Sequence, residues 1–131
     1  MSNVDLATAQ GLVRKAVEAA GAQGTPVAVA VVDRGGHVVA SARMDGVSYL
    51  MLDVATKKAT FAGAMGAPTH MIVEMAKGDE VLALAFSGQA DIMALPGGLP
   101  ISGDAGPVGG LGVSGGHYSQ DQAVAEAALG G

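Results

Sequence analysis

Glycine recurs at short intervals from Gly106 to Gly116, where the sequence reads GPVGGLGVSGG and Val and Leu fill the gaps. A strand with so few side chains leaves room for the backbone of a neighbouring element to approach it closely. We therefore expect residues 107–113 to form a strand, with Gly112 at a close approach. We also expect Gly115 and Gly116 to make the turn into a final helix.

The segment from Gly110 to Gly115 also has the form G-x-G-x-x-G. This form is typical of a dinucleotide-binding loop when a second strand follows the loop and its helix. The sequence after Gly115 is too short for that strand, so we expect no dinucleotide site. An anion site at the start of the last helix stays open as a weaker alternative. Against it, Ser119 and Gln122 predict a capping box, and Asp121 adds a negative charge in the first turn.

The composition indicates how the interior is filled. Half of the 131 residues are hydrophobic but only 3% are aromatic, so Ala, Val, Leu and Met must form most of the core. The length predicts one domain, residues 1–131. Charged residues make up only 15% of the chain, and so few groups cover a surface poorly. We therefore expect the chain to associate with copies of itself.

The charge balance excludes several partner classes. The chain has 7 basic and 12 acidic residues and no basic run longer than a pair, which argues against nucleic-acid binding. It has no Cys, so it forms no disulfide and offers no thiolate ligand. No apolar run reaches the roughly 18 residues that a membrane span needs. We expect a cytoplasmic protein with no membrane partner.

Hydrophobic periodicity predicts the element order α-β-β-α-α-β-β-α around a largely antiparallel sheet. The expected helices are 6–20, 50–65, 69–77 with Thr69 as its cap, and 119–129. The expected strands are 26–32, 37–43, pieces around a Pro-Gly-Gly turn within 91–101, and 107–113. Residues 79–86 fit a helix or a strand equally well. The second helix is expected to carry an apolar stripe of Leu50, Val54, Phe61 and Met65.

Four separated stretches resemble one family. They are VAVVDRGGHVVASARMDG, KATFAGAMGAPT, GGLPI, and GGLGVSGG followed by QDQAVAEAAL. In this order and spacing they are similar to the GlcG/HbpS-like proteins, which include haem-binding members and the C-terminal domain of PduO-type adenosyltransferases. The resemblance runs from about Val27 to the end of the sequence.

The resemblance implies an α+β fold with a five-stranded, largely antiparallel sheet flanked by helices. It further implies self-association, from dimers to octamers, and genes that lie in catabolic operons. The implied function is an accessory one, binding of a small molecule, with haem or another tetrapyrrole as the candidate ligand and cofactor. Matching positions that we assign to the ligand site are Gly97, Gly98, Ser114, Gly115 and Gly116.

Haem needs an axial ligand, and His70 and His117 are the candidates. His70 lies near a helix start, where the helix dipole favours its neutral, ligating form. His37 begins a strand beside a turn and is expected on the surface. The first helix, where one branch of the family would carry a ligand, has no His. Aromatic content is low for a haem pocket, and the 7 Met residues partly compensate.

Arg43, Asp45 and Lys58 indicate a second class of activity, that of a small enzyme without a cofactor. Arg43 would hold a carboxylated substrate, and Asp45 or Lys58 would move a proton. Plainer explanations are an ion pair between Arg43 and Asp45 and an exposed position for Lys58. A third alternative is a structural, oligomer-forming unit.

The sequence leaves Asp33, Asp45 and Asp121 as alternatives for a functional carboxylate. Its three His residues are scattered, and none stands three or four positions from another. We therefore expect no dedicated metal site.

Overall fold

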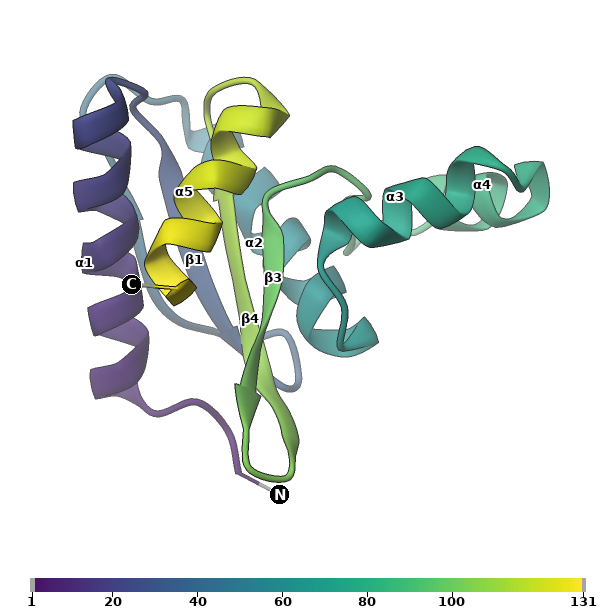
Figure 1. The fold of residues 1–131 in the computed structure, drawn as a ribbon, viewed down its shortest axis with the longest axis horizontal. Helices are drawn as coiled ribbons and strands as arrows, with labels where there is room; N and C mark the ends of the chain where they lie inside the picture. Colours follow the sequence, from purple (N-terminus) through teal and green to yellow (C-terminus); the bar gives the residue numbers. More distant parts are fainter. Residues whose placement is uncertain (1, 131) are drawn as a thin grey trace.

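The computed structural model describes residues 2–130 as an antiparallel sheet with helices on both faces. The elements are α1 (Leu6–Gln23), β1 (Ala28–Asp33), β2 (Val38–Arg43), α2 (Tyr49–Met65), α3 (Thr69–Lys77), α4 (Glu80–Ser87), β3 (Gly98–Gly103), β4 (Gly106–Ser114) and α5 (Tyr118–Gly130). The strand order is β2-β1-β4-β3. Helices α1 and α5 cover one face of the sheet and α2 covers the other, while α3 and α4 project to one side (Figure 1).

The α+β class and the antiparallel sheet agree with the expectation, but the strand number does not. Residues 2–130 form a sheet of four strands, where the resemblance implied five. Residues 91–95, which we predicted to include a strand piece, belong to no strand. Gly97 follows them with φ of 120°, a conformation that interrupts an extended run. The strand β3 therefore begins only at Gly98.

Residues 79–86, which fit either element in the sequence, fall almost entirely in helix α4. Asp79 caps this helix, because its carboxylate accepts a hydrogen bond from the N–H of Leu82 at 3.0 Å. The order is thus α-β-β-α-α-α-β-β-α, with one helix more between the two hairpins than expected.

Two predicted helix caps are wrong. Pro68, not Thr69, precedes α3, and the hydroxyl of Thr69 instead accepts a hydrogen bond from the N–H of Gly98 at 2.9 Å. At α5 the predicted box of Ser119 and Gln122 does not form. The helix begins at Tyr118, and the Gln120 side chain accepts from the N–H of His117 at 2.9 Å. An earlier start shifts the capping positions toward the N-terminus.

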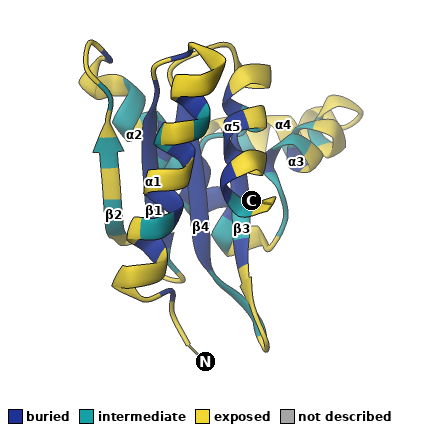
Figure 2. Ribbon diagram, turned by 60° about the vertical axis from the view of Figure 1, so that its left-hand side comes forward, coloured by how far each residue is buried: buried dark blue, intermediate teal, exposed yellow. Residues whose placement is uncertain are grey.

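The two central strands carry large side chains on one face and small ones on the other. The large residues pack with α1 and α5 in the main core: Val29, Val31, Leu111 and Val113. The small residues face α2: Ala28, Ala30, Gly110 and Gly112. Figure 2 shows both strands buried at the centre of the molecule. Rings are scarce in this core because methyl groups and backbone fill it.

The backbone of α2 lies directly on β4. A Cβ added at Gly112 would meet the carbonyl oxygen of Ala55 at 1.9 Å, and one at Gly110 would meet that of Ala59 at 2.0 Å. Only glycine fits such a contact, so the predicted close approach at Gly112 is confirmed. It also explains an error, because the buried face of α2 is mostly alanine and two members of the predicted stripe, Leu50 and Met65, are exposed.

Candidate functional site

Lys58 and Asp121 form an ion pair inside the molecule. The Lys58 Nζ lies 3.2 Å from the Asp121 Oδ2, and the two side chains are only 1% and 2% exposed. The Nζ also donates to the carbonyl oxygen of Val113 at 2.8 Å, and the Asp121 Oδ1 accepts from the N–H of Gly116 at 3.0 Å. This pair joins α2, β4 and α5, so Lys58 does not have the exposed position considered from the sequence.

Burial lowers the pKa of Lys58, and the carboxylate of Asp121 opposes that shift. Two glycines of the predicted ligand site pack around the pair. A Cβ at Gly97 would meet the Lys58 Nζ at 3.0 Å, and one at Gly98 would meet the Lys58 carbonyl oxygen at 2.5 Å. Because removing either charge leaves the other buried and unpaired, the pair is costly to break.

The turn from β4 into α5 brings together Ser114, Gly115 and Gly116. Ser114 is buried with its hydroxyl 3.5 Å from the sulfur of Met51, and Gly115 has φ of 145°. The N–H groups of Gly116, His117, Ser119 and Asp121 all donate within the turn. Few backbone N–H groups of this turn are left free to bind an anion, so the geometry favours a structural role for these glycines.

Arg43 and Asp45 lie apart from Lys58, at the exposed turn between β2 and α2. The Arg43 guanidinium donates to the carbonyl oxygen of Val47, and no ion pair joins it to Asp45 within residues 2–130. The structure therefore does not gather these three residues in one pocket. The ammonium of Lys58 is enclosed by protein and out of reach of a dissolved substrate.

A cavity of about 450 Å³ lies between α3, residues 95–96 and the first turns of α5. We call it the α3–α5 pocket. Val73, Leu95 and Pro96 form its apolar wall, and its polar lining residues are His70, Glu74, Lys77, Tyr118, Ser119 and Gln122. A larger groove of about 670 Å³ between α3 and α4 shares Val73, Lys77 and Leu95 with it. Both volumes are in the range of small-molecule sites.

Of the three histidines, only His70 lines the α3–α5 pocket. Its Nδ1 is buried and has no hydrogen-bond partner within the described residues. His117 is exposed, and its Nδ1 lies 2.7 Å from the hydroxyl of Ser119 and 3.2 Å from the N–H of the same residue. His37 is on the surface, as expected, with its side chain 81% exposed.

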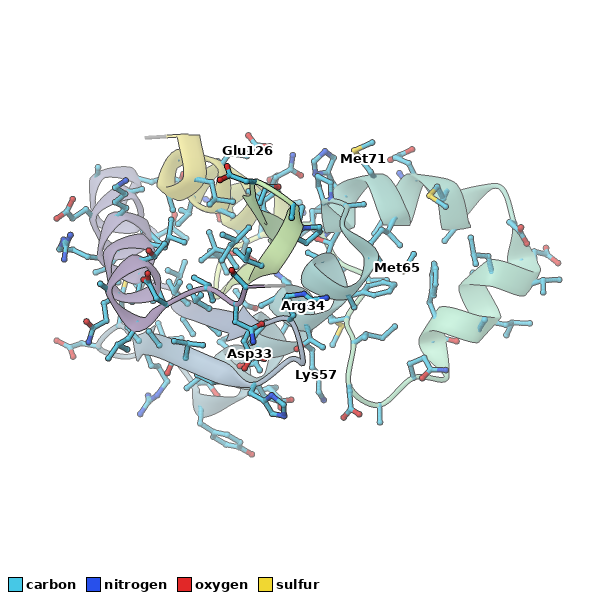
Figure 3. All side chains as sticks on the ribbon, turned by 90° about the horizontal axis from the view of Figure 1, so that it is seen from below. Asp33, Arg34, Lys57, Met65, Met71 and Glu126 are labelled. Atoms are coloured by element: carbon cyan, nitrogen blue, oxygen red, sulfur yellow. The ribbon has the colours of Figure 1, made fainter. Side chains whose placement is uncertain are left out.

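The three carboxylates that the sequence left open occupy different environments. Asp33 and Asp45 lie at surface turns, whereas Asp121 is buried in the ion pair. The Asp33 carboxylate accepts the backbone N–H of His37, which lowers the pKa of Asp33. Figure 3 shows Asp33, the last residue of β1, beside Arg34, where the turn to β2 begins.

The sequence did not single out Lys77, Leu95 or Tyr118, which all line the α3–α5 pocket. They come from two helices and a connecting segment, and nothing in their local pattern shows that they meet. The only local feature that could have indicated the pocket is the apolar pair before Pro96, Ala94 and Leu95, and the sequence pattern predicts a strand for this pair.

A four-stranded antiparallel sheet with α1 and α5 on one face and α2 on the other defines the class of domain. Residues 4–130 match the family model described as haem degrading protein HbpS-like. The chain therefore belongs to the HbpS-like family, and the resemblance seen in the sequence is confirmed.

Individual relatives cover nearly the whole chain. An uncharacterized 15.0 kDa protein of Citrobacter freundii, from the dhaT-dhaS intergenic region, is 34% identical over 98% of this chain and 92% of its own length. The crystal structure of a double mutant of Streptomyces reticuli HbpS is 32% identical, with a TM-score of 0.90 over 99% of this chain and 87% of that one. The crystal structure of a PduOC:heme complex is 31% identical, with a TM-score of 0.88 over 98% and 94%.

Residues 2–130 contain neither a cluster of metal-ligating side chains nor a membrane-spanning helix. No group of three or more His, Asp or Glu side chains is placed to hold a metal ion. No helix in this range is long and apolar enough to cross a membrane.

Proposed function

We propose that this chain binds a small molecule in the α3–α5 pocket. The observation that carries the proposal is the pocket itself, a cavity with an apolar wall and a polar end where His70 and Lys77 meet the start of α5. Such a combination is typical of ligand sites. A relative of the same fold, solved as a heme complex, supports a tetrapyrrole as the ligand class.

Haem fits this pocket through its organic part. Val73, Leu95 and Pro96 would offer an apolar wall to a flat ring, and Lys77, paired with Glu74 at 2.8 Å, would supply a cation for a carboxylate. His117 does not line this pocket, so it is not placed to bind iron there.

A haem titration followed by absorbance tests the proposal. We expect a saturable shift of the Soret band with the native chain and loss of that shift in Leu95→Glu, which places a negative charge on the wall of the pocket. The matched control is Val38→Glu on β2, because Val38 is also partly exposed but lies outside the pocket. No shift with the native chain would refute the proposal, and unchanged binding by Leu95→Glu would show that the site lies elsewhere.

Self-association is a second proposal. Helix α4 is strongly apolar in sequence, EVLALAFS, yet none of its residues is buried. Val81 and Leu84 of α4 are 78% and 72% exposed, and Met71 and Met75 of α3 are more than half exposed. Figure 3 shows Met71 pointing outward from α3. An apolar surface of this kind favours burial against a second copy of the chain.

A further inference from the structure

The two ring nitrogens of His70 lie in different surroundings, one inside the protein and one at the α3–α5 pocket. The Nδ1 is buried and has no hydrogen-bond partner among residues 2–130, whereas the residue as a whole lines the α3–α5 pocket. The Nε2 is therefore the ring nitrogen that a ligand in the pocket can reach. Which nitrogen carries the proton decides what the ligand meets there.

A proton on Nδ1 would be a buried donor without an acceptor, which is among the rarest arrangements in folded proteins. A bare lone pair on Nδ1 is less costly, because under-satisfied buried acceptors are tolerated more often than donors. The less costly neutral tautomer of His70 therefore carries its proton on Nε2, the ring nitrogen that is not buried. An imidazole in this form donates a hydrogen bond at Nε2 and has no lone pair there for a metal.

Lys77 and Glu74 both line the pocket beside His70, and they pair with each other at 2.8 Å, so the pair carries no net charge and the ligand group is selected by the donors that stay free. The Gln122 amide is engaged with Glu126 at 2.8 Å. His70 and Lys77 thus remain as two donors for a carboxylate group, since an ammonium has three protons and Glu74 takes one.

We infer that His70 recognises a carboxylate of the ligand as an Nε2–H donor, together with Lys77, and does not coordinate iron. The inference rests on the proposed function and names the chemistry of that site. It reverses the axial role that the residue type suggested, because the buried Nδ1 has no acceptor for the proton that an iron-bound Nε2 would require.

Three probes separate a carboxylate contact from an iron contact. They are haem, metal-free protoporphyrin IX with the same two carboxylates, and its dimethyl ester, which has none. We expect haem and protoporphyrin IX to bind the native chain with dissociation constants within about threefold. The ester should bind about 10- to 100-fold more weakly, as the loss of a charge-assisted hydrogen bond predicts.

Two variants at His70 complete the experiment. His70→Gln places an amide N–H close to the position of Nε2 and should keep most of the protoporphyrin affinity, whereas His70→Ala should lose about tenfold or more. His37→Ala, on the distant surface turn, is the control. Circular dichroism checks that each variant folds.

The outcomes distinguish the inference from the proposed function. Binding of haem but not of protoporphyrin IX, with a Soret band that both His70 variants change, would overturn the inference and leave the function intact. Absence of binding by every probe would overturn both.

Discussion

Replacing Gly112 with alanine tests the close contact between α2 and β4. The new Cβ would lie 1.9 Å from the carbonyl oxygen of Ala55 and 2.7 Å from the nitrogen of Ala59. Ordinary contacts begin at 3.4 Å, so α2 must move away from the sheet by about 1.5 Å. Both atoms belong to the helix backbone, so no side-chain rotation can relieve the overlap.

Overpacking of this kind costs about 1–3 kcal/mol, and we expect the upper end because a whole helix has to move. For a chain of this length, about 3 kcal/mol corresponds to a fall in Tm of roughly 12 °C. The displacement would also stretch the bonds of Lys58, which α2 carries, to Val113 and Asp121. Loss of that pair would add to the fall.

Thermal unfolding of Gly112→Ala and of native protein at one concentration measures the effect, since association makes Tm depend on concentration. The matched control is Gly21→Ala in α1, where a Cβ meets nothing within 4 Å. We expect this control to stabilise the chain by about 0.5–1 kcal/mol. A Tm for Gly112→Ala within about 2 °C of the native value would refute the packing argument.

Three other predictions follow from the ion pair and from the exposed helix. Lys58→Met should lower the free energy of unfolding by about 3–5 kcal/mol, because it leaves Asp121 buried and unpaired. Adding Asp121→Asn should restore most of the lost stability. Denaturant unfolding of both single variants and the double variant measures this, and a loss below about 1 kcal/mol in Lys58→Met would contradict the prediction. The pKa of Lys58 is lower in the folded chain than its ordinary 10.5, so the unfolded chain binds more protons between those two values and the contribution of this group to stability rises with pH there. The denaturant midpoint of the native protein should therefore move further above that of Lys58→Met as the pH approaches 10, and a constant difference between the two midpoints would argue against the shift. Leu84→Glu on α4 should lower the native mass measured by light scattering while Leu6→Glu on α1, also exposed, leaves it unchanged; equal masses would exclude α4 as the contact.

Most of the secondary structure could be predicted from the sequence because it is determined locally. Helix α1 runs from the Asp5 cap to Gly24, and those signals lie within a few residues of the ends that they define. The glycines of β4 indicated a close approach, but the sequence did not identify α2 as the partner. The stripe on α2 was misread because the glycines opposite it leave room for alanine and not for Leu50 or Met65.

The candidate site could be predicted only in part. His70 was named from its residue type and lies in the α3–α5 pocket, yet Lys77, Leu95 and Tyr118 meet there through tertiary packing that leaves no local pattern. The pairing of Lys58 with Asp121 spans 63 positions, and each residue alone had a plausible surface role. Long-range electrostatic partners of this kind become visible only when the chain is folded.

The unequal faces of the sheet determine how freely this sequence can change. On the side of α1 and α5, cores of Val and Leu accept exchanges of similar volume. On the side of α2, the absence of side chains at Gly110 and Gly112 sets the distance between helix and sheet. A larger residue at either position cannot be offset by a smaller one, because no residue is smaller than glycine. Substitutions among chains of this architecture should therefore accumulate on the face that packs against α1 and α5. On the other face the distance between α2 and the sheet stays fixed, and this distance keeps the Lys58 ammonium within reach of Asp121.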